Sequence, residues 1–175
     1  MKKYALALTL LLFYFLPKAQ TMKNDDNLKK RISEIEDRIA IKNLVDTFSI
    51  LADQKESQKQ TLLFTENATV ESIMNGQRGA ALVGRKQIGD AFANFLSLFE
   101  TVYHINEQQT VTLNSDKASG ISYCAVTLIG VENGKKMKTS FGIYYNDKYV
   151  RENNHWFIAK RVSTFAWQDK QELNH

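Results

Sequence analysis

The chain has 175 residues and a net charge of +4, from 23 Lys and Arg against 19 Asp and Glu. Three of those lysines and none of the acids lie in the first 20 residues, so the remaining chain is close to neutral. This excludes a nucleic-acid-binding surface, which needs a clustered excess of Lys and Arg. The single cysteine, Cys124, excludes an intrachain disulfide and a zinc site of the Cys/His type. We expect one domain without a metal or cofactor.

The first 20 residues have the pattern of a secretory signal. Lys2 and Lys3 give a basic start, and an unbroken run of apolar and Thr residues follows from Tyr4 to Leu16. That run is short for a membrane span, which needs about 20 residues. We therefore expect a signal peptide at 1–20, cleaved near Ala19 or Gln20, and a secreted or periplasmic protein. An uncleaved membrane anchor is the alternative.

Two helices are expected next. The polar residues 21–33 predict a loose linker, or alternatively a frayed lead into the helix. Ser33 with Glu36 has the spacing of a capping box that would start the first helix. Apolar residues at helical spacing then form one buried stripe, and this helix is expected to end at Asp53. A second, shorter helix would close on Leu62, Leu63 and Phe64. The stripe consists of Ile41, Leu44, Val45, Phe48 and Ala52.

The remaining chain predicts strands, with one further helix. Ala68 to Met74 is expected to pair with a short strand at Ala80 to Val83, with a turn beginning at Asn75-Gly76 between them. Gly84 precedes a helix with an apolar face, and four long strands follow. The helix face consists of Ile88, Phe92, Phe95, Leu96 and Phe99. The four strands are expected at about 103–113, 118–131, 136–151 and 155–167.

Two tight turns fix the pairing of these strands. Two-residue loops at Asn133-Gly134 and Asn153-Asn154 place Tyr123 opposite Tyr144, and Asp147 opposite Lys160. Paired residues share a sheet face, although a single bulge would exchange part of the assignment. The core face is expected to hold Cys124, Val126, Leu128, Met137, Phe141, Ile143, Tyr145, Trp156, Ile158 and Val162. The outer face is expected to hold Tyr123, Ala125, Thr127, Ile129, Tyr144, Arg161, Ser163, Phe165 and Trp167.

The order of these elements and several local motifs resemble one known group of proteins. Phe64-Thr65-Glu66-Asn67-Ala68 resembles a Phe-Thr-Glu-Asp-Ala turn, and Gly84 to Ile88 resembles a Gly-x-x-x-Ile helix start. The chain resembles the nuclear transport factor 2-like superfamily, in its SnoaL-like and scytalone dehydratase-like group. The likeness covers residues 34–168 and leaves a tail at 169–175. Further matching positions are Phe48, Asp53, Leu63, His104, Tyr145, Asn146, Asp147, Arg151, Trp156 and Arg161.

The resemblance implies an α+β fold, a cone-shaped α+β barrel with three helices packed on a strongly curved mixed sheet. It also implies a cavity in which an acid and a His act on a small organic molecule in catalytic relatives. Asp53 would be the acid and His104 the His. Phe48 stands where the group tends to have a Tyr, and no second candidate His lies in the strands, which weakens the catalytic interpretation.

The residue pattern by itself leaves both catalytic candidates open. Asp53 points away from the apolar stripe on a helical wheel, which is typical of a solvated helix end. Simple alternation along the strand turns His104 outward unless the strand bulges between it and Val111. As ligand-binding residues we predict Phe48, Cys124, Phe141, Tyr145 and Trp156.

Three classes of function remain, and the structure can separate them. A binder of a small apolar or aromatic ligand would have an open cavity without a paired Asp53 and His104. A cofactor-free dehydratase or isomerase would have both the cavity and the pair. An interaction module would have a filled cavity. The aromatic outer face predicts a homodimer, with Tyr123, Tyr144, Phe165 and Trp167 near the contact. No membrane contact is expected after signal cleavage.

Overall fold

The computed structural model describes residues 5–173, with side chains from residue 25 onward. The chain divides into two compact units, residues 1–39 and 40–175. Helix α1, Ala5–Asp53, supplies the described part of the first unit and the first helix of the second. The expected helix start at Ser33 is wrong. Residues 21–32 contain no Gly or Pro that would stop a helix, and their three Lys, one Arg, one Met and one Leu favour one, so this segment is helical.

The expected signal at residues 1–20 lies outside the residues whose side chains are described. Within the described residues, no helix combines the length and apolar composition needed to cross a bilayer. Cleavage and export therefore stay a prediction. The mass of the chain recovered from its native host would test them, and a chain that retains Met1 in the membrane fraction would contradict them.

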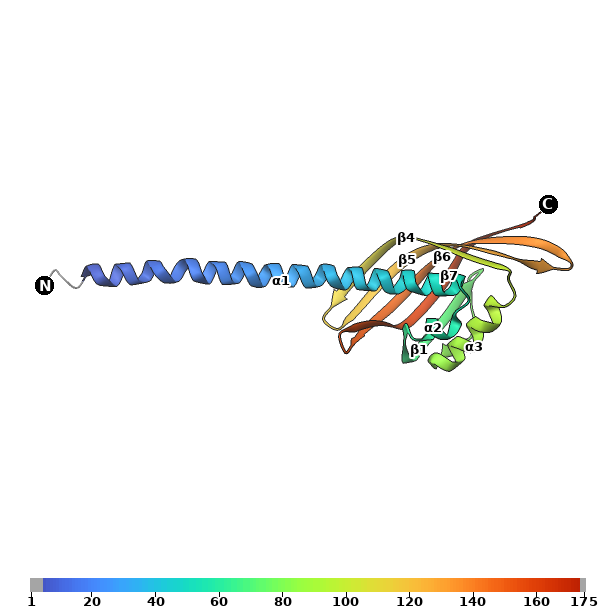
Figure 1. The fold of residues 1–175 in the computed structure, drawn as a ribbon, viewed down its shortest axis with the longest axis horizontal. Coiled ribbons are helices and arrows are strands. Elements are labelled where there is room, and N and C mark those ends of the chain that lie inside the picture. The colour runs from blue at the N-terminus through green and yellow to red at the C-terminus, as the bar shows by residue number, and fades with distance from the viewer. Residues whose placement is uncertain (1–4, 174–175) are drawn as a thin grey trace. The chain divides into compact units, whose positions relative to one another are not determined.

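In the second unit, three helices supply one side of the core. The α1 stripe is buried as predicted, with Ile41 and Val45 almost fully covered. A short helix α2, Ser57–Thr61, follows, and α3 spans Gly84–Leu96 with Ile88 and Leu96 buried. Figure 1 shows α2 beside α3, near the start of the sheet. The predicted α1 end at Asp53 is confirmed.

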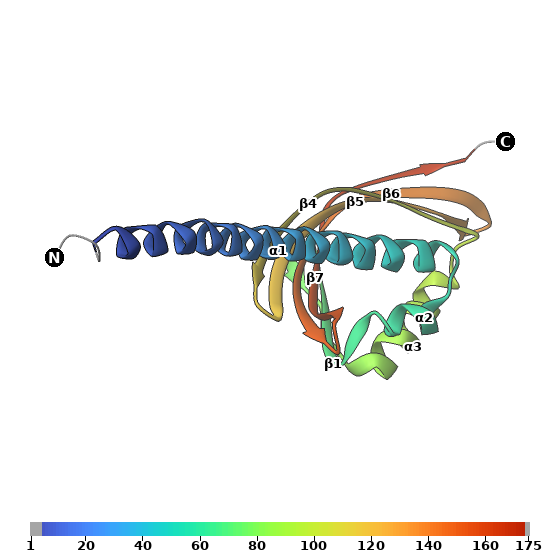
Figure 2. The same cartoon turned by 60° about the vertical axis from the view of Figure 1, so that its left-hand side comes forward.

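The sheet is mixed and runs in the order β2-β1-β7-β6-β5-β4, with β3 also pairing β1. All pairs are antiparallel except β1 with β7, which is parallel. The strands curve around the helical side (Figure 2). Their bounds are β1 Phe64–Met74, β2 Gln77–Arg78, β3 Leu82–Val83, β4 Thr101–Asn114, β5 Lys117–Glu132, β6 Lys135–Glu152 and β7 His155–Glu172.

The ends of several elements differ from the prediction. Phe64 begins β1 rather than closing a helix, because β1 pairs with β7 from Phe64 onward. β7 continues to Glu172, since it stays paired with β6 as far as Met137. The expected partner strand at 80–83 is shorter and is joined by β2, which follows the turn at Asn75-Gly76.

Both predicted hairpin turns are present, and one predicted register is wrong. Glu132 pairs Lys135 and Tyr123 faces Tyr144, as expected. Asp147, however, pairs with Arg161 and not with Lys160. An extra residue, Ala159, bulges from β7 and shifts the pairing by one position beyond it.

The same bulge moves part of β7 to the other sheet face. Arg161 and Ser163 were expected on the outer face, but both are buried, and both line a cavity together with Phe165. The shift of one residue turns over the side chains from Lys160 to Phe165, because side chains alternate along a strand. A second shift, between Phe165 and Trp167, returns Trp167 to the outer face, where it is exposed. Val162, expected in the core, is only partly covered.

Candidate functional site

A cavity of about 270 Å³ lies within the second unit. Its wall is mainly aromatic and aliphatic, with a few polar side chains between them, which is the usual composition of a small-molecule site. Its apolar lining residues are Phe48, Ala52, Val70, Leu82, Ala91, Phe92, Phe95, Leu96, Val126, Leu128, Phe141, Ile143 and Phe165. Its polar lining residues are Gln60, Ser72, His104, Tyr145, Arg161 and Ser163.

Asp53 and His104 form a close pair at this cavity. His104 Nδ1 lies 2.6 Å from Asp53 Oδ1, and the backbone N–H of His104 donates to Asp53 Oδ2 at 3.2 Å. The His104 side chain is 8% exposed and that of Asp53 27%, so the pair is largely shielded from solvent. An ionised carboxylate only accepts hydrogen bonds, so Nδ1 carries the proton and Nε2 keeps the basic lone pair of the neutral ring.

A bulge in β4 explains why His104 faces inward. Asn106 pairs Cys124 and Gln109 pairs Ser122, so two β4 residues stand opposite one β5 residue. The bulge lets His104 point inward while Val111, beyond it, also packs on the core. This is the condition under which the sequence predicted an inward His104.

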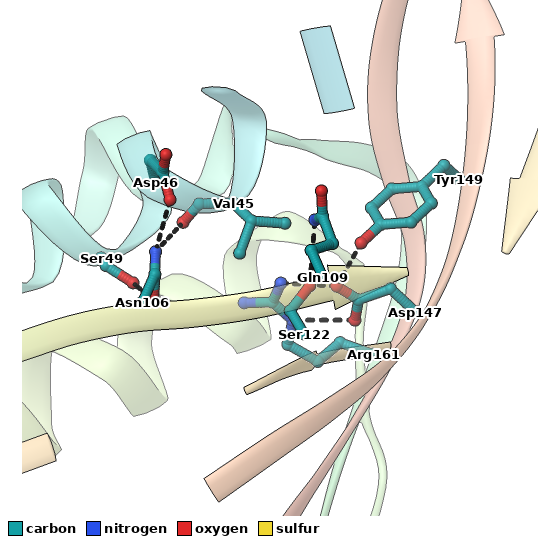
Figure 3. A network of polar contacts seen from close by, with 9 residues as sticks. All are labelled: Val45, Asp46, Ser49, Asn106, Gln109, Ser122, Asp147, Tyr149 and Arg161. Atoms are coloured by element: carbon teal, nitrogen blue, oxygen red, sulfur yellow. Dashed lines mark hydrogen bonds and ion pairs between the residues drawn. The ribbon is translucent and has the colours of Figure 1, made fainter. Parts of the chain in front are cut away.

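The side chain of Asn106 ties the bulged strand to α1. Its Nδ2 donates to Val45 O at 3.2 Å and to Asp46 Oδ1 at 2.9 Å, and its Oδ1 accepts from Ser49 Oγ at 3.0 Å. Figure 3 shows these contacts, which join strand to helix two residues after His104. They hold β4 against the helix that ends in Asp53.

Arg161 and Asp147 form a second pair, which is fully buried. The Nε of Arg161 donates to Asp147 Oδ1 at 2.9 Å, and one terminal nitrogen donates to Oδ2 at 2.6 Å. Tyr149 also donates to Asp147 Oδ2 at 2.9 Å (Figure 3). Burial acts to lower the Arg161 pKa, but the charge and hydrogen bonds of Asp147 outweigh it, so the pKa is raised and the guanidinium stays charged.

Two aromatic rings contact the Arg161 guanidinium. Its central carbon lies 4.0 Å from the Tyr145 ring centre and 4.3 Å from that of Phe48. Such contacts stabilise a desolvated cation. Burial also raises the Tyr145 pKa, so the hydroxyl is neutral and able to donate or accept a hydrogen bond. The sequence placed Arg161 on the wrong face because nothing in its composition marks the Ala159 bulge.

His104 is poised to accept a proton. Burial lowers its pKa below the ordinary value of 6.5, and the nearby charge of Arg161 acts in the same direction. Asp53 opposes both through its hydrogen bond and charge, but the net shift is downward. The imidazole is therefore neutral at physiological pH, the form that a general base needs.

The predicted site residues divide into two groups. Phe48, His104, Phe141 and Tyr145 line the cavity. Asp53 is not among the lining residues and reaches the cavity through His104.

Two of the predicted ligand-binding residues do not line the cavity. Cys124 is buried behind the wall, and burial raises its pKa to about 11, so the thiol is protonated. Trp156 is buried elsewhere, with the Arg151 guanidinium 4.6 Å from its ring. The two positions were assigned by alternation, which places a residue on the core face without saying whether it reaches the open space.

Two buried polar atoms of the cavity residues have no hydrogen-bond partner within the described part of the chain. They are Oε1 of Gln60 and Nη1 of Arg161. Within residues 25–173, whose side chains are described, no group of three or more His, Cys, Asp or Glu side chains lies close enough together to hold a metal ion. The sequence reasoning missed Gln60, because a Gln in a short polar helix gives no signal of burial.

Proteins similar in sequence and in fold match most of this chain. An uncharacterized protein of Mycobacterium tuberculosis, Rv2910c, is 27% identical over 139 residues, which are 78% of this chain and 90% of that protein. A solved nuclear transport factor 2-like protein from Novosphingobium aromaticivorans has a TM-score of 0.59 at 19% identity and covers 80% of this chain and 88% of its own.

A solved hexachlorocyclohexane dehydrochlorinase, LinA type 2, has a TM-score of 0.67 at 17% identity, and the match covers 82% of this chain and 93% of that one. These structural likenesses confirm the predicted cone fold and carry no activity over to this chain. The family model for the SnoaL-like domain matches residues 33–162. The chain therefore belongs to the SnoaL-like domain family.

Proposed function

We propose that the protein is a cofactor-free enzyme that moves a proton on a small apolar or aromatic molecule, in the manner of a dehydratase or isomerase. The observation that carries this proposal is the Asp53–His104 pair at an open cavity. A non-catalytic binder needs the cavity but has no use for a carboxylate that fixes the tautomer of a buried imidazole.

In the proposed reaction, His104 Nε2 removes a proton from a carbon next to a carbonyl group. The electron pair of the broken C–H bond stays on the substrate and moves toward the carbonyl oxygen, and Asp53 stabilises the imidazolium that forms. Arg161 supplies a permanent positive charge in the same cavity, where it favours the developing oxyanion. Return of the proton to another atom of the substrate completes an isomerisation. Transfer of the proton from the imidazolium to a neighbouring hydroxyl, which then leaves as water while the electron pair returns to form a C=C bond, completes a dehydration.

A binding role is the second candidate, and the apolar wall supports it. Phe48 presents no hydroxyl to the cavity where the wider group tends to have a Tyr, which removes one polar group that chemistry could use. A binder would hold the same neutral ring compounds and release them unchanged.

Deuterium exchange separates the two candidates without knowledge of the natural substrate. The protein is incubated in D₂O with the cyclic ketone 2-tetralone, and loss of the α-hydrogens is followed by NMR. We expect exchange above the buffer rate, reduced about 10²- to 10⁴-fold in His104→Gln and also reduced in Asp53→Asn. The exposed His155 provides the matched control, so His155→Gln should exchange like the wild type. Binding of the ketone without exchange would show a binder.

We also propose a dimer through the outer face of β4, β5 and β6. Tyr103, Ile105 and Tyr123 are each about half exposed there, and the rings of Tyr123 and Tyr144 lie 5.9 Å apart. Apolar side chains gathered on one sheet face are typical of a protein contact. Phe165, which was expected in this contact, is excluded because it lines the cavity.

A further inference from the structure

Two serine side chains lie next to each other in the cavity wall. Ser72 on β1 pairs with Ser163 on β7 across the parallel strands, and both residues line the cavity. Ser163 alternates along β7 with the cavity residues Arg161 and Phe165, and Ser72 alternates along β1 with Val70. Both serines therefore lie on the inner face of the sheet. Neighbouring strands are about 4.8 Å apart, so one ligand atom can reach both hydroxyl groups.

Both serine hydroxyls are available to a ligand. Within the described residues, no hydrogen bond engages the Oγ of Ser72 or of Ser163. The cavity residues whose sealed polar atoms lack a partner are Gln60 and Arg161, and neither serine is among them. The two serine oxygens are therefore accessible, unlike the atoms of Gln60 and Arg161. Accessible polar groups in a mostly apolar wall are the groups that orient a bound molecule.

The serines and His104 belong to opposite ends of the strand order. His104 comes from β4, the last strand in that order, whereas the serines come from β1 and β7 near the other end. The cavity wall on the strands between them is mainly apolar, with Val126 on β5 and Phe141 and Ile143 on β6. A molecule that offers a carbon atom to His104 and also reaches the serines must carry its second polar group away from the reacting carbon.

The serine end of the cavity favours a neutral group. A serine hydroxyl has no charge and can either donate or accept a hydrogen bond. The neighbouring Arg161 is already paired with Asp147 through two hydrogen bonds, so it does not require a second anion. A charged substituent would lose its solvation at this end without gaining an opposite charge. The matching group is a neutral oxygen, which can bond with both hydroxyls.

We infer that Ser72 and Ser163 are specificity-determining residues, and that the substrate is a neutral ring ketone with a second oxygen substituent, a hydroxyl or a ketone, remote from the reacting carbon. This inference rests on the proposed cavity function and specifies its substrate class. A site that hydrogen-bonds a substrate oxygen discriminates against an analogue without that oxygen, because the polar groups of the site then stay unpaired.

Two 2-tetralones that differ in one substituent test the inference. In 6-hydroxy-2-tetralone an oxygen lies on the ring remote from the ketone, and 6-methyl-2-tetralone carries a methyl group of similar size at the same position. Titration calorimetry should give the hydroxyl compound a dissociation constant about tenfold below that of the methyl compound. Equal affinities, tighter binding of the methyl compound, or no binding of either would overturn the inference.

Alanine variants assign the preference to the serines. We expect the double variant Ser72→Ala with Ser163→Ala to bind the two compounds equally. It should fold, because neither hydroxyl has a partner within the described residues to lose. The control is Ser119→Ala on β5, which does not line the cavity and should keep the wild-type preference. A preference that survives in the double variant would contradict the inference.

Should the double variant not fold, the single variants decide, because Ser72→Ala and Ser163→Ala should each reduce the preference. The result is separable from catalysis. A wild type that exchanges no deuterium yet prefers the hydroxyl compound through the serines refutes the proposed reaction and leaves this inference standing. Exchange of both ketones that depends on His104, without any preference between them, does the reverse.

Discussion

At the scale of single residues, His104 links the site to the stability of the fold. Its pKa in the folded chain lies below the ordinary 6.5, chiefly because burial disfavours the imidazolium. In the unfolded chain the same side chain takes up a proton near pH 6.5. Between the two pKa values the unfolded state binds more protons, so the free energy of unfolding rises with pH across that window. The contribution is complete above about pH 6.5 and is lost as the pH falls toward the folded-state pKa.

We predict that acidification from about pH 7.5 to about pH 5.5 lowers the free energy of unfolding more in the wild type than in His104→Gln, which has nothing to titrate at this position. Urea unfolding at both values measures the difference. His155→Gln, changed at an exposed site, should keep the wild-type dependence. Glu71 does not interfere, because the hydrogen bonds from Lys160 and Arg78 lower its pKa below the ordinary 4.5. Equal losses in the wild type and His104→Gln would contradict the assignment.

At the scale of elements, the sequence predicted the strands and turns better than the faces. The turns at Asn133-Gly134 and Asn153-Asn154 could be read because both positions adopt positive φ, which Asn and Gly tolerate. The bulge at Ala159 could not be read, since a bulge has no fixed composition and depends on the pairing of the whole sheet. It turned Arg161 and Ser163, two of the six polar residues that line the cavity, to the inner face of the sheet.

The residues of the candidate site were likewise predicted where a local motif marks them and missed where their position depends on tertiary packing. Asp53 and His104 were identified through the family resemblance, and the β4 bulge brings them together. Gln60 was missed because its burial depends on how α2 packs in the folded chain, and a five-residue helix has too short a pattern to show a buried side. The type of a residue predicts whether its side chain can be buried, whereas tertiary packing determines which buried side chains contact one another.

The close approach of β4 and β5 gives an element-scale prediction. A Cβ atom on Gly120 would lie 2.6 Å from the backbone oxygen of Thr110, so the two strands would have to separate. Gly120→Ala should lower the free energy of unfolding by about 1–3 kcal/mol. Gly79→Ala is the matched control, because its Cβ would meet nothing closer than 3.6 Å, and its effect should stay within about 0.5 kcal/mol. Thermal or urea unfolding compares them, and equal effects would show that the strands separate easily.

At the scale of the whole molecule, the outer face of the sheet sets the expected oligomeric state. We predict that the wild type sediments as a dimer at micromolar concentration, and that Tyr123→Glu yields monomers, because a charge in an apolar contact loses its solvation without gaining a partner. Leu62→Glu is the control, since Leu62 is exposed at the end of α2, away from this face, and its variant should remain dimeric. A monomeric wild type would refute the contact.

The parallel pairing of β1 with β7 determines when the cavity can exist. Phe64 and Ile158, which pair across these strands, are almost a hundred residues apart in the chain, and β1 has only the short β2 and β3 as its other neighbours. Val70 and Ser72 line the cavity from β1, and Arg161 and Ser163 line it from β7. During synthesis β1 emerges early but cannot be covered until the last strand arrives, so a growing chain carries an unpaired edge for most of its length. The cavity is therefore among the last parts of the molecule to form, and a chain interrupted before β7 lacks the wall that Arg161 and Ser163 supply.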